Sequence, residues 1–241
     1  MKSGVLALIL LAALGSAGLA GPLNPCPAGS LQDYIDLGAG GCTLGAALFY
    51  NFGDSSVFGS TPGADPIPAG SIQVVPFGNS LSPGFEFLVS ALLGPGELRQ
   101  ARIGYTVGLS AAGTLTARLA MSGSSVAPDG GATVIEELCS GGEFFAPGLC
   151  PDPNSLGFLP TEALIVFDIG VDAGLSDGLE LQQLTTLGVL NDIVVDGGLA
   201  GSAGIGSVSN QFTIVPEPGT IWLLSAGFLC GWLGCWRRKA Q

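Results

Sequence analysis

Carboxylates are the side chains of this sequence that could do chemistry, because it contains no histidine. Without imidazole, Ser-His and Cys-His nucleophilic arrangements and the usual zinc sites are excluded. A glycoside hydrolase would need two carboxyl groups that face each other across a cleft. The candidate glutamates follow no motif: Glu86, Glu97, Glu136, Glu137, Glu143, Glu162 and Glu180. We expect no catalytic residues and no enzymatic activity, with a carboxylate-based glycoside hydrolase as an alternative.

Acidic residues are densest in one stretch, at Asp168, Asp172, Asp177, Glu180, Asp192 and Asp196. Carboxylates separated by glycine turns can bind calcium, which takes about six to eight oxygen ligands. The spacing fits neither the EF-hand loop nor the nonapeptide calcium repeat, and aspartate is common in solvent-facing turns. We therefore expect no cofactor, and we keep Asp168, Asp172 and Asp177 as candidate ligands of a possible calcium ion.

Aromatic side chains offer a second kind of site, because exposed rings can stack on sugars. The conceivable platforms are Tyr34, Tyr50, Phe58 and Tyr105. Aromatic residues in strands belong more often to the core. A carbohydrate-binding module that uses exposed aromatics is therefore an alternative function.

Four cysteines lie in the central part of the chain: Cys26, Cys42, Cys139 and Cys150. An even number in an oxidising compartment indicates two disulfides, and four cysteines allow three pairings. We favour Cys26–Cys42 and Cys139–Cys150, because closing a short loop costs less entropy. Cys230 and Cys235 lie in an apolar segment near the C-terminus, where small packing residues are the simplest interpretation, with lipid attachment or interchain pairing as alternatives.

The N-terminus has the order of a secretory signal peptide over residues 1–20. Lys2 gives the positive start, Val5 to Leu14 form the apolar region, and Gly18-Leu19-Ala20 is a small-residue cleavage pattern. Residues 21–214 remain as an exported body, which is long enough for one sizeable domain with its own core.

The body is acidic. It holds 18 of the 19 acidic residues of the chain, all except Glu217. Of the seven basic residues it holds only Arg99, Arg102 and Arg118, so its formal net charge is −15. Nucleic acid is excluded as a partner, because neutralising phosphates requires a basic face. An acidic exported surface favours solubility.

Short β-type runs separated by Gly, Pro, Asn and Asp turns fill the body. In the run 84–90, Phe85, Phe87 and Val89 fall on one face and Glu86 on the other, which is the period-two alternation of a strand. The expected strands are 46–52, 71–77, 84–90, 102–109, 114–121, 133–139, 163–171 and 211–215. This pattern predicts an all-β fold, an antiparallel β-sandwich of jelly-roll-like type.

Four finer expectations follow from the same pattern. Strands 102–109 and 114–121 should form a hairpin across residues 110–113. The apolar run 163–171 should be buried on both faces. Residues 175–190 should form strands rather than a helix, since Gly178 and Gly188 interrupt any helical pattern, and 31–35 should be extended or form one short turn.

The last 27 residues combine three features. Val215-Pro216-Glu217-Pro218 is followed by residues 219–236, which carry no charge, and then by Arg237, Arg238 and Lys239 within the tail 237–241. As a helix, 18 residues reach about 27 Å, close to the hydrocarbon thickness of a bilayer. The basic residues would keep the C-terminus in the cytoplasm and so fix the orientation. These features alone also fit an ordinary single-span membrane anchor.

This order of parts over residues 215–241 resembles the PEP-CTERM sorting signal of Gram-negative bacteria that make exopolysaccharide. The resemblance implies that Val215, Pro216, Glu217 and Pro218 form a recognition box and that exosortase, a membrane-embedded cysteine protease, cleaves the tail. It implies an intermediate anchored in the inner membrane with a periplasmic body, which then reaches the cell surface or the medium. The expected role is that of a non-enzymatic surface or matrix protein associated with exopolysaccharide in a biofilm.

Overall fold

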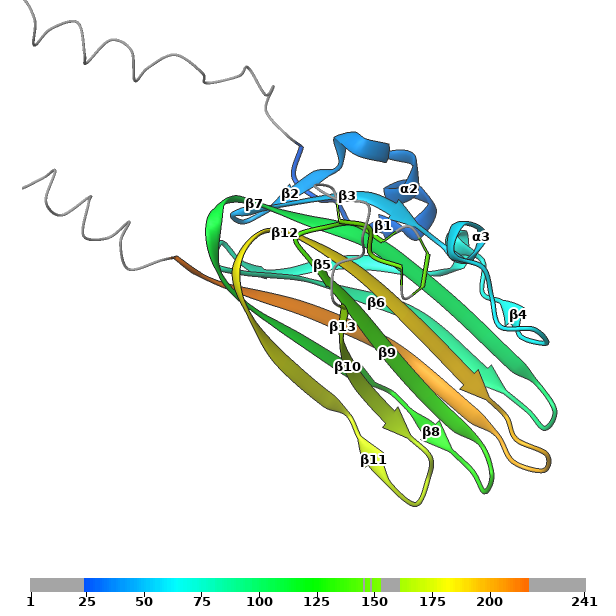
Figure 1. Ribbon diagram of the computed structural model, residues 1–241. Coiled ribbons are helices and arrows are strands. Elements are labelled where there is room, and N and C mark those ends of the chain that lie inside the picture. Colours follow the sequence, from blue (N-terminus) through cyan, green and yellow to red (C-terminus); the bar gives the residue numbers. More distant parts are fainter. Residues whose placement is uncertain (1–23, 145, 148, 153–160, 217–241) are drawn as a thin grey trace, which may run out of the picture.

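The computed structural model describes residues 24–144, 146–147, 149–152 and 161–216 (Figure 1). Strands dominate this part of the chain, and nearly all strand pairs are antiparallel, so the all-β prediction is confirmed. In chain order the elements are β1 (Gly29–Ser30), α2 (Leu31–Asp36), η2 (Gly38–Gly40), β2 (Cys42–Leu44), β3 (Ala47–Gly53), α3 (Ser55–Phe58), β4 (Asp65–Pro66), η3 (Ala69–Ser71), β5 (Gln73–Asn79), β6 (Ser82–Leu93), β7 (Leu98–Ser122), β8 (Ser125–Val126), β9 (Gly131–Ser140), β10 (Thr161–Asp168), β11 (Ala173–Gly174), β12 (Ser176–Asp196) and β13 (Ala203–Pro216).

Two long strands, β7 and β12, pair along most of their length and fold over together, so that each belongs to both layers of a sandwich-like body (Figure 1). We call sheet I the layer formed by β3, residues 98–109 of β7, residues 186–196 of β12, β9, β10 and β11. Sheet II contains β1, β5, β6, β13, residues 113–122 of β7 and residues 176–184 of β12.

The predicted hairpin across residues 110–113 is wrong. The two halves of β7 do not pair with each other; one half lies in sheet I and the other in sheet II. Register shifts in β12 between Leu181 and Leu184 and between Leu184 and Thr186 lie opposite this bend. Such irregularities bend a strand and increase its twist, which allows the β7–β12 ribbon to pass between the layers.

The core lies between the two sheets and is rich in aromatic rings. Phe49 and Phe85 meet edge to face, with ring centroids 4.7 Å apart, and Phe52 stacks on Tyr105 at 5.3 Å. Edge-to-face and offset pairs add stability beyond the area that they bury. Phe85, Phe87 and Val89 of β6 are all buried, as their period-two alternation predicts.

The other local expectations have mixed outcomes. Residues 176–196 form the strand β12, as expected. Residues 31–36 form the short helix α2, because Ser30 and Asp33 exchange hydrogen bonds in a capping box at its start. The prediction that 163–171 is buried on both faces is wrong, since Ile165 is 49% exposed while Leu164 and Val166 are buried. Among the described residues, only the two-residue β11 lies beyond β10 in the sheet.

Both predicted disulfides are present: Cys26 pairs with Cys42, and Cys139 with Cys150. The first links the segment before β1 to β2, and the second links the end of β9 to the segment that follows it. All four cysteines are buried.

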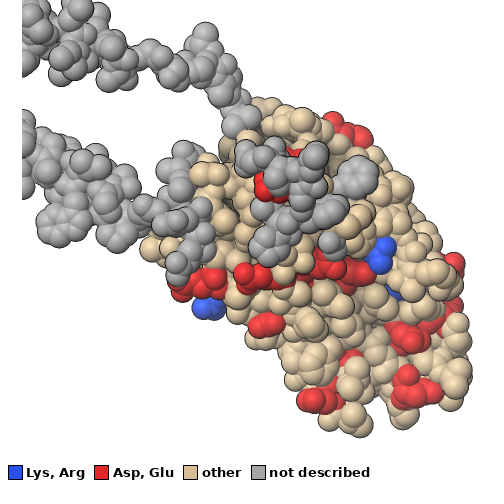
Figure 2. Space-filling model, viewed as in Figure 1, with Lys and Arg blue, Asp and Glu red and all other residues tan. Residues whose placement is uncertain are grey.

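The two ends of the described chain, residues 24 and 216, lie toward the same end of the sandwich (Figure 1). Within the described ranges, the structure contains no helix long and apolar enough to cross a membrane. Acidic side chains are spread across the face seen in Figure 2, with few basic ones among them.

Candidate functional sites

The first candidate site is the predicted recognition box, which begins inside the folded body. The last strand, β13, ends at Pro216, one residue beyond the expected strand 211–215 and two beyond the expected end of the body at 214. Its final residues Val215 and Pro216 lie opposite Thr114 and Gly113 of β7. Val215 is 49% exposed. The other predicted parts of the tail, Glu217, Pro218, 219–236 and Arg237, Arg238 and Lys239, lie outside the described residues, as does the predicted signal peptide.

Three of the four predicted sugar platforms cannot act as such. Tyr34 is fully buried and Tyr105 is 3% exposed, because both rings pack in the core, and Phe58 is 8% exposed, because its ring packs over Gly104 of β7. Their prediction as exposed platforms is wrong. Tyr50 is half-buried and lines two surface hollows on sheet I, of about 470 and 600 Å³. Burial, followed by the nearby Glu143 carboxylate, raises the pKa of Tyr50 above its usual value.

Two of the three acidic residues expected near a calcium ion accept backbone hydrogen bonds. Asp168 accepts a hydrogen bond from the backbone of Gly170 at 3.0 Å, and Asp177 accepts from the backbone N–H groups of Ile165 at 3.0 Å and Gly178 at 2.8 Å. In the part of the chain that the structure describes, no three Asp, Glu or Cys side chains come together as a metal site. Asp168, Asp172 and Asp177 are therefore not brought together as ligands.

A buried carboxyl group that the sequence analysis did not single out lies between the sheets. Glu136 of β9 is fully buried, and its Oε2 accepts a hydrogen bond from Asn210 Nδ2 of β13. Asn210 Nδ2 also donates to Asn191 Oδ1 of β12 at 3.0 Å. Burial raises the pKa of Glu136 to about 8, so this group is mostly protonated at neutral pH. The missed signal was the alternation in β9, which places Glu136 on the same face as Val134 and Leu138.

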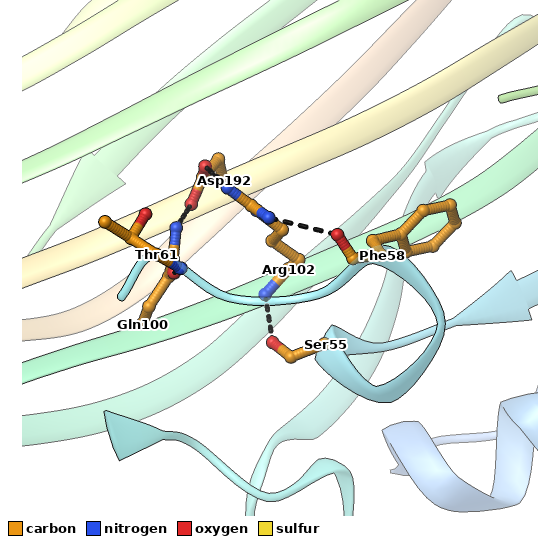
Figure 3. A network of polar contacts seen from close by, with 6 residues as sticks. All are labelled: Ser55, Phe58, Thr61, Gln100, Arg102 and Asp192. Atoms are coloured by element: carbon orange, nitrogen blue, oxygen red, sulfur yellow. Dashed lines mark hydrogen bonds and ion pairs between the residues drawn. The ribbon is translucent and has the colours of Figure 1, made fainter. Parts of the chain in front are cut away.

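The outer face of sheet I carries a polar network that holds a connecting segment against β7 (Figure 3). The guanidinium of Arg102 donates to Asp192 Oδ2 from Nε at 3.1 Å and to the carbonyl oxygen of Phe58 at 3.0 Å. Gln100 donates to Asp192 Oδ1 at 2.5 Å and accepts from the backbone N–H of Thr61 at 2.6 Å. These side chains form their hydrogen bonds within the protein, so the network holds the connecting segment in place rather than binding a ligand.

The outer face of sheet II is open instead, and a groove of about 740 Å³ runs over β5, β13, β7 and β12. Its lining is mainly polar or small: Phe77, Thr116, Arg118, Leu119, Ala120, Ser176, Asp177, Gly178, Leu179, Glu180, Ser209 and Gln211. The volume lies within the range of small-molecule sites. Sequence reasoning missed this groove, since its residues come from four separate strands.

Comparison with known families identifies the C-terminal segment. Residues 215–239 match the family model described as the PEP-CTERM protein-sorting motif. The chain carries a PEP-CTERM sorting motif. The match starts at Val215, within the last two residues of β13, so the PEP-CTERM motif follows the folded body without a linker. No curated protein matches the chain.

Solved structures offer only distant similarities. One is described as TmCBM61 in complex with beta-1,4-galactotriose (11% identity, TM-score 0.29, 61% of this chain and 83% of that one). Another is the enzymatically active domain of tailspike protein 4 of Bacteriophage CBA120 (9% identity, TM-score 0.31, 80% and 22%). A third is described as "CBM4 structure and function" (11% identity, TM-score 0.25, 72% and 89%). TM-scores this low carry no argument about function.

Proposed function

We propose that this protein is an exported, non-enzymatic surface protein that exosortase releases from a membrane-anchored precursor. In this proposal residues 1–20 direct export, 219–236 hold the precursor in the inner membrane with its body in the periplasm, and Arg237, Arg238 and Lys239 fix the orientation. Cleavage at the box Val215–Pro218 then sends the body to the cell surface or the medium. The observation that carries the proposal is the sorting motif at 215–239.

The position of the box supports this order of events. Strand β13 lies between β6 and β7 in sheet II and is paired as far as Pro216. A cut after Pro216 would leave all of these strand pairs intact, whereas a cut within the strand would remove pairing from the centre of a sheet. The released body would therefore keep its fold.

For the body, we propose association with extracellular polysaccharide of a biofilm, without a cofactor. The open polar groove on sheet II and the acidic surface favour a soluble binding module over a nucleic-acid-binding protein. A carboxylate-based hydrolase gains no support from Glu136, because a fully buried carboxyl group cannot reach a polymer.

The sorting proposal can be tested with variants of the box in the native host. Full-length protein with Glu217→Ala and Pro218→Ala should stay in the membrane fraction with its tail, while the unchanged protein is released. Glu162→Ala is a suitable control, because it also removes an exposed acid but lies on β10, away from the box. Equal release of the box variant and the control would refute recognition through these residues.

A further inference from the structure

One transverse row of residues crosses the groove on sheet II. Phe77 of β5 lies opposite Gly84 of β6, which lies opposite Gln211 of β13. Gln211 in turn lies opposite Arg118 of β7, and Arg118 opposite Gly178 of β12. Neighbouring strands are about 4.8 Å apart. An aromatic ring, an amide and a guanidinium group therefore stand in one line across the sheet.

The two glycines of the row leave space for its larger side chains. A Cβ atom at Gly84 would come within 2.7 Å of Cζ of Phe77, so the phenyl ring extends over this position toward the groove. A Cβ atom at Gly178 would lie 3.5 Å from Cγ of Arg118. The ring and the guanidinium stem thus lie along the sheet. The short residues Ala120 and Ser209, which lie opposite each other two residues further along β7 and β13, line the groove beside this row.

The polar side chains of the groove have unused hydrogen-bonding capacity. Among the described residues, none of these side chains forms a hydrogen bond or ion pair with another part of the protein: Thr116, Arg118, Glu180, Ser209 and Gln211. On the outer face of sheet I, Gln100, Arg102 and Asp192 instead bond to one another and to the segment that covers them (Figure 3). The two sets of side chains therefore differ: those on sheet I are engaged by their own chain, whereas those of the groove on sheet II are free to bond to a partner.

The chemistry of the lining selects a class of ligand. A flat ring beside amide, hydroxyl, carboxylate and guanidinium groups suits a molecule with apolar faces and many hydroxyls, which is a sugar. A polyanionic chain would be repelled by Asp177, Glu180 and the net charge of the body. A polycationic chain would meet the positive charge of Arg118 in the row.

We propose that the groove over β5, β13, β7 and β12 binds a neutral polysaccharide chain, with Phe77 stacking on a sugar ring and Gln211, Arg118 and Glu180 bonding to hydroxyls. This inference rests on the proposed association of the body with polysaccharide, and it is independent of how the protein is sorted.

The test is a binding assay with protein purified from the native host. Soluble β-glucan, galactan and mannan serve as neutral probes, alginate as the anionic probe and chitosan as the cationic one. We expect retention by at least one neutral probe, and binding at least about tenfold weaker for Phe77→Ala and for Arg118→Ala. Ser209→Trp, which places a large ring in the groove and leaves Phe77, Gln211 and Arg118 unchanged, should also abolish binding.

Two matched variants serve as controls. Arg99→Ala removes another exposed arginine of β7, and Tyr50→Ala removes the half-buried ring on sheet I. Both should bind as the unchanged protein does. Binding lost only in Tyr50→Ala would place the site on sheet I and overturn the assignment. Binding of the protein to alginate or chitosan alone, or to no probe, would also overturn it. Because the assay uses purified protein, failed sorting in the host would not alter its outcome.

Discussion

At the scale of single residues, the most unusual group is the carboxyl of Glu136, buried between the sheets beside Asn210. Around it stand Tyr105 of β7 and Asn191 of β12. Burial, and then the Glu136 carboxyl, raises the pKa of Tyr105 well above its usual value, so both groups favour their neutral forms. The interior of this sandwich is therefore polar at one point but uncharged at neutral pH.

This group predicts a dependence of stability on pH. In the folded protein the pKa of Glu136 is about 8, so the group keeps its proton up to that pH, whereas the unfolded chain releases it near the ordinary glutamate pKa of 4.5. Between these values the folded state binds more protons, so the free energy of unfolding should fall by about 1.4 kcal/mol per pH unit from this group as pH rises. Glu136→Gln should remove this slope in urea unfolding between pH 5 and 8.

Glu162→Gln is the control, since Glu162 is an exposed acid on the neighbouring strand β10. Its pH profile should run parallel to that of the unchanged protein. A Glu136→Gln profile with the same slope as the unchanged protein would show that Glu136 is ionised in the folded state.

At the scale of elements, segment 54–66 depends on a few contacts to β7. Arg102 binds it through the Phe58 carbonyl oxygen and through a hydrogen bond from its own backbone N–H to Ser55 Oγ at 2.9 Å. The ring of Phe58 lies over Gly104, where a Cβ atom would come within 2.3 Å of it. A glycine in the middle of β7 thus allows α3 to pack on the sheet.

Arg102→Ala should loosen this segment. The variant loses the side-chain bonds to Phe58 and Asp192 and leaves the Asp192 carboxylate without its ion-pair partner. We expect the free energy of unfolding to fall by about 1 to 3 kcal/mol and limited proteolysis to cut earlier within 54–66. Arg99→Ala should change neither. Unchanged proteolysis of Arg102→Ala would mean that apolar packing of Phe58 alone holds the segment.

The two disulfides should contribute similar amounts to the free energy of unfolding, but they should stabilise different elements. Each closes a short loop, with sequence separations of 16 and 11, so removing either by paired Cys→Ser substitution should cost about 2 to 4 kcal/mol. Loss of Cys26–Cys42 should expose the α2 end of the core, and loss of Cys139–Cys150 the end of β9. Hydrogen exchange can locate each effect; uniform exchange changes in both variants would contradict this local action.

The strands and the disulfides could be predicted from sequence because their signals are local. Alternation in Phe85, Phe87 and Val89 marks a buried face, and the short spacings of the cysteines favour the pairs that form. The fold-over of β7 could not be predicted, because a Ser-Ala-Ala-Gly connection suits a hairpin and a bend between layers equally. The register that aligns Phe77, Gln211 and Arg118 depends on strands far apart in the chain, so the groove was also beyond sequence reasoning.

At the scale of the whole molecule, we propose that cleavage by exosortase releases the folded body from its membrane anchor. Its acidic sandwich ends where the PEP-CTERM motif begins, and both ends of the described chain lie toward the same end of the body (Figure 1). The last strand of the fold therefore ends within the first two residues of the sorting motif.

The most direct test is the intact mass of the protein recovered from the surface or medium of its native host, compared with that from a strain lacking exosortase. The account predicts a chain that begins near Gly21 and ends within the box Val215–Pro218 when exosortase is present, and a chain that extends to Gln241 when it is absent. A chain that keeps its tail to Gln241 in both strains would contradict the account and make residues 219–236 a permanent anchor.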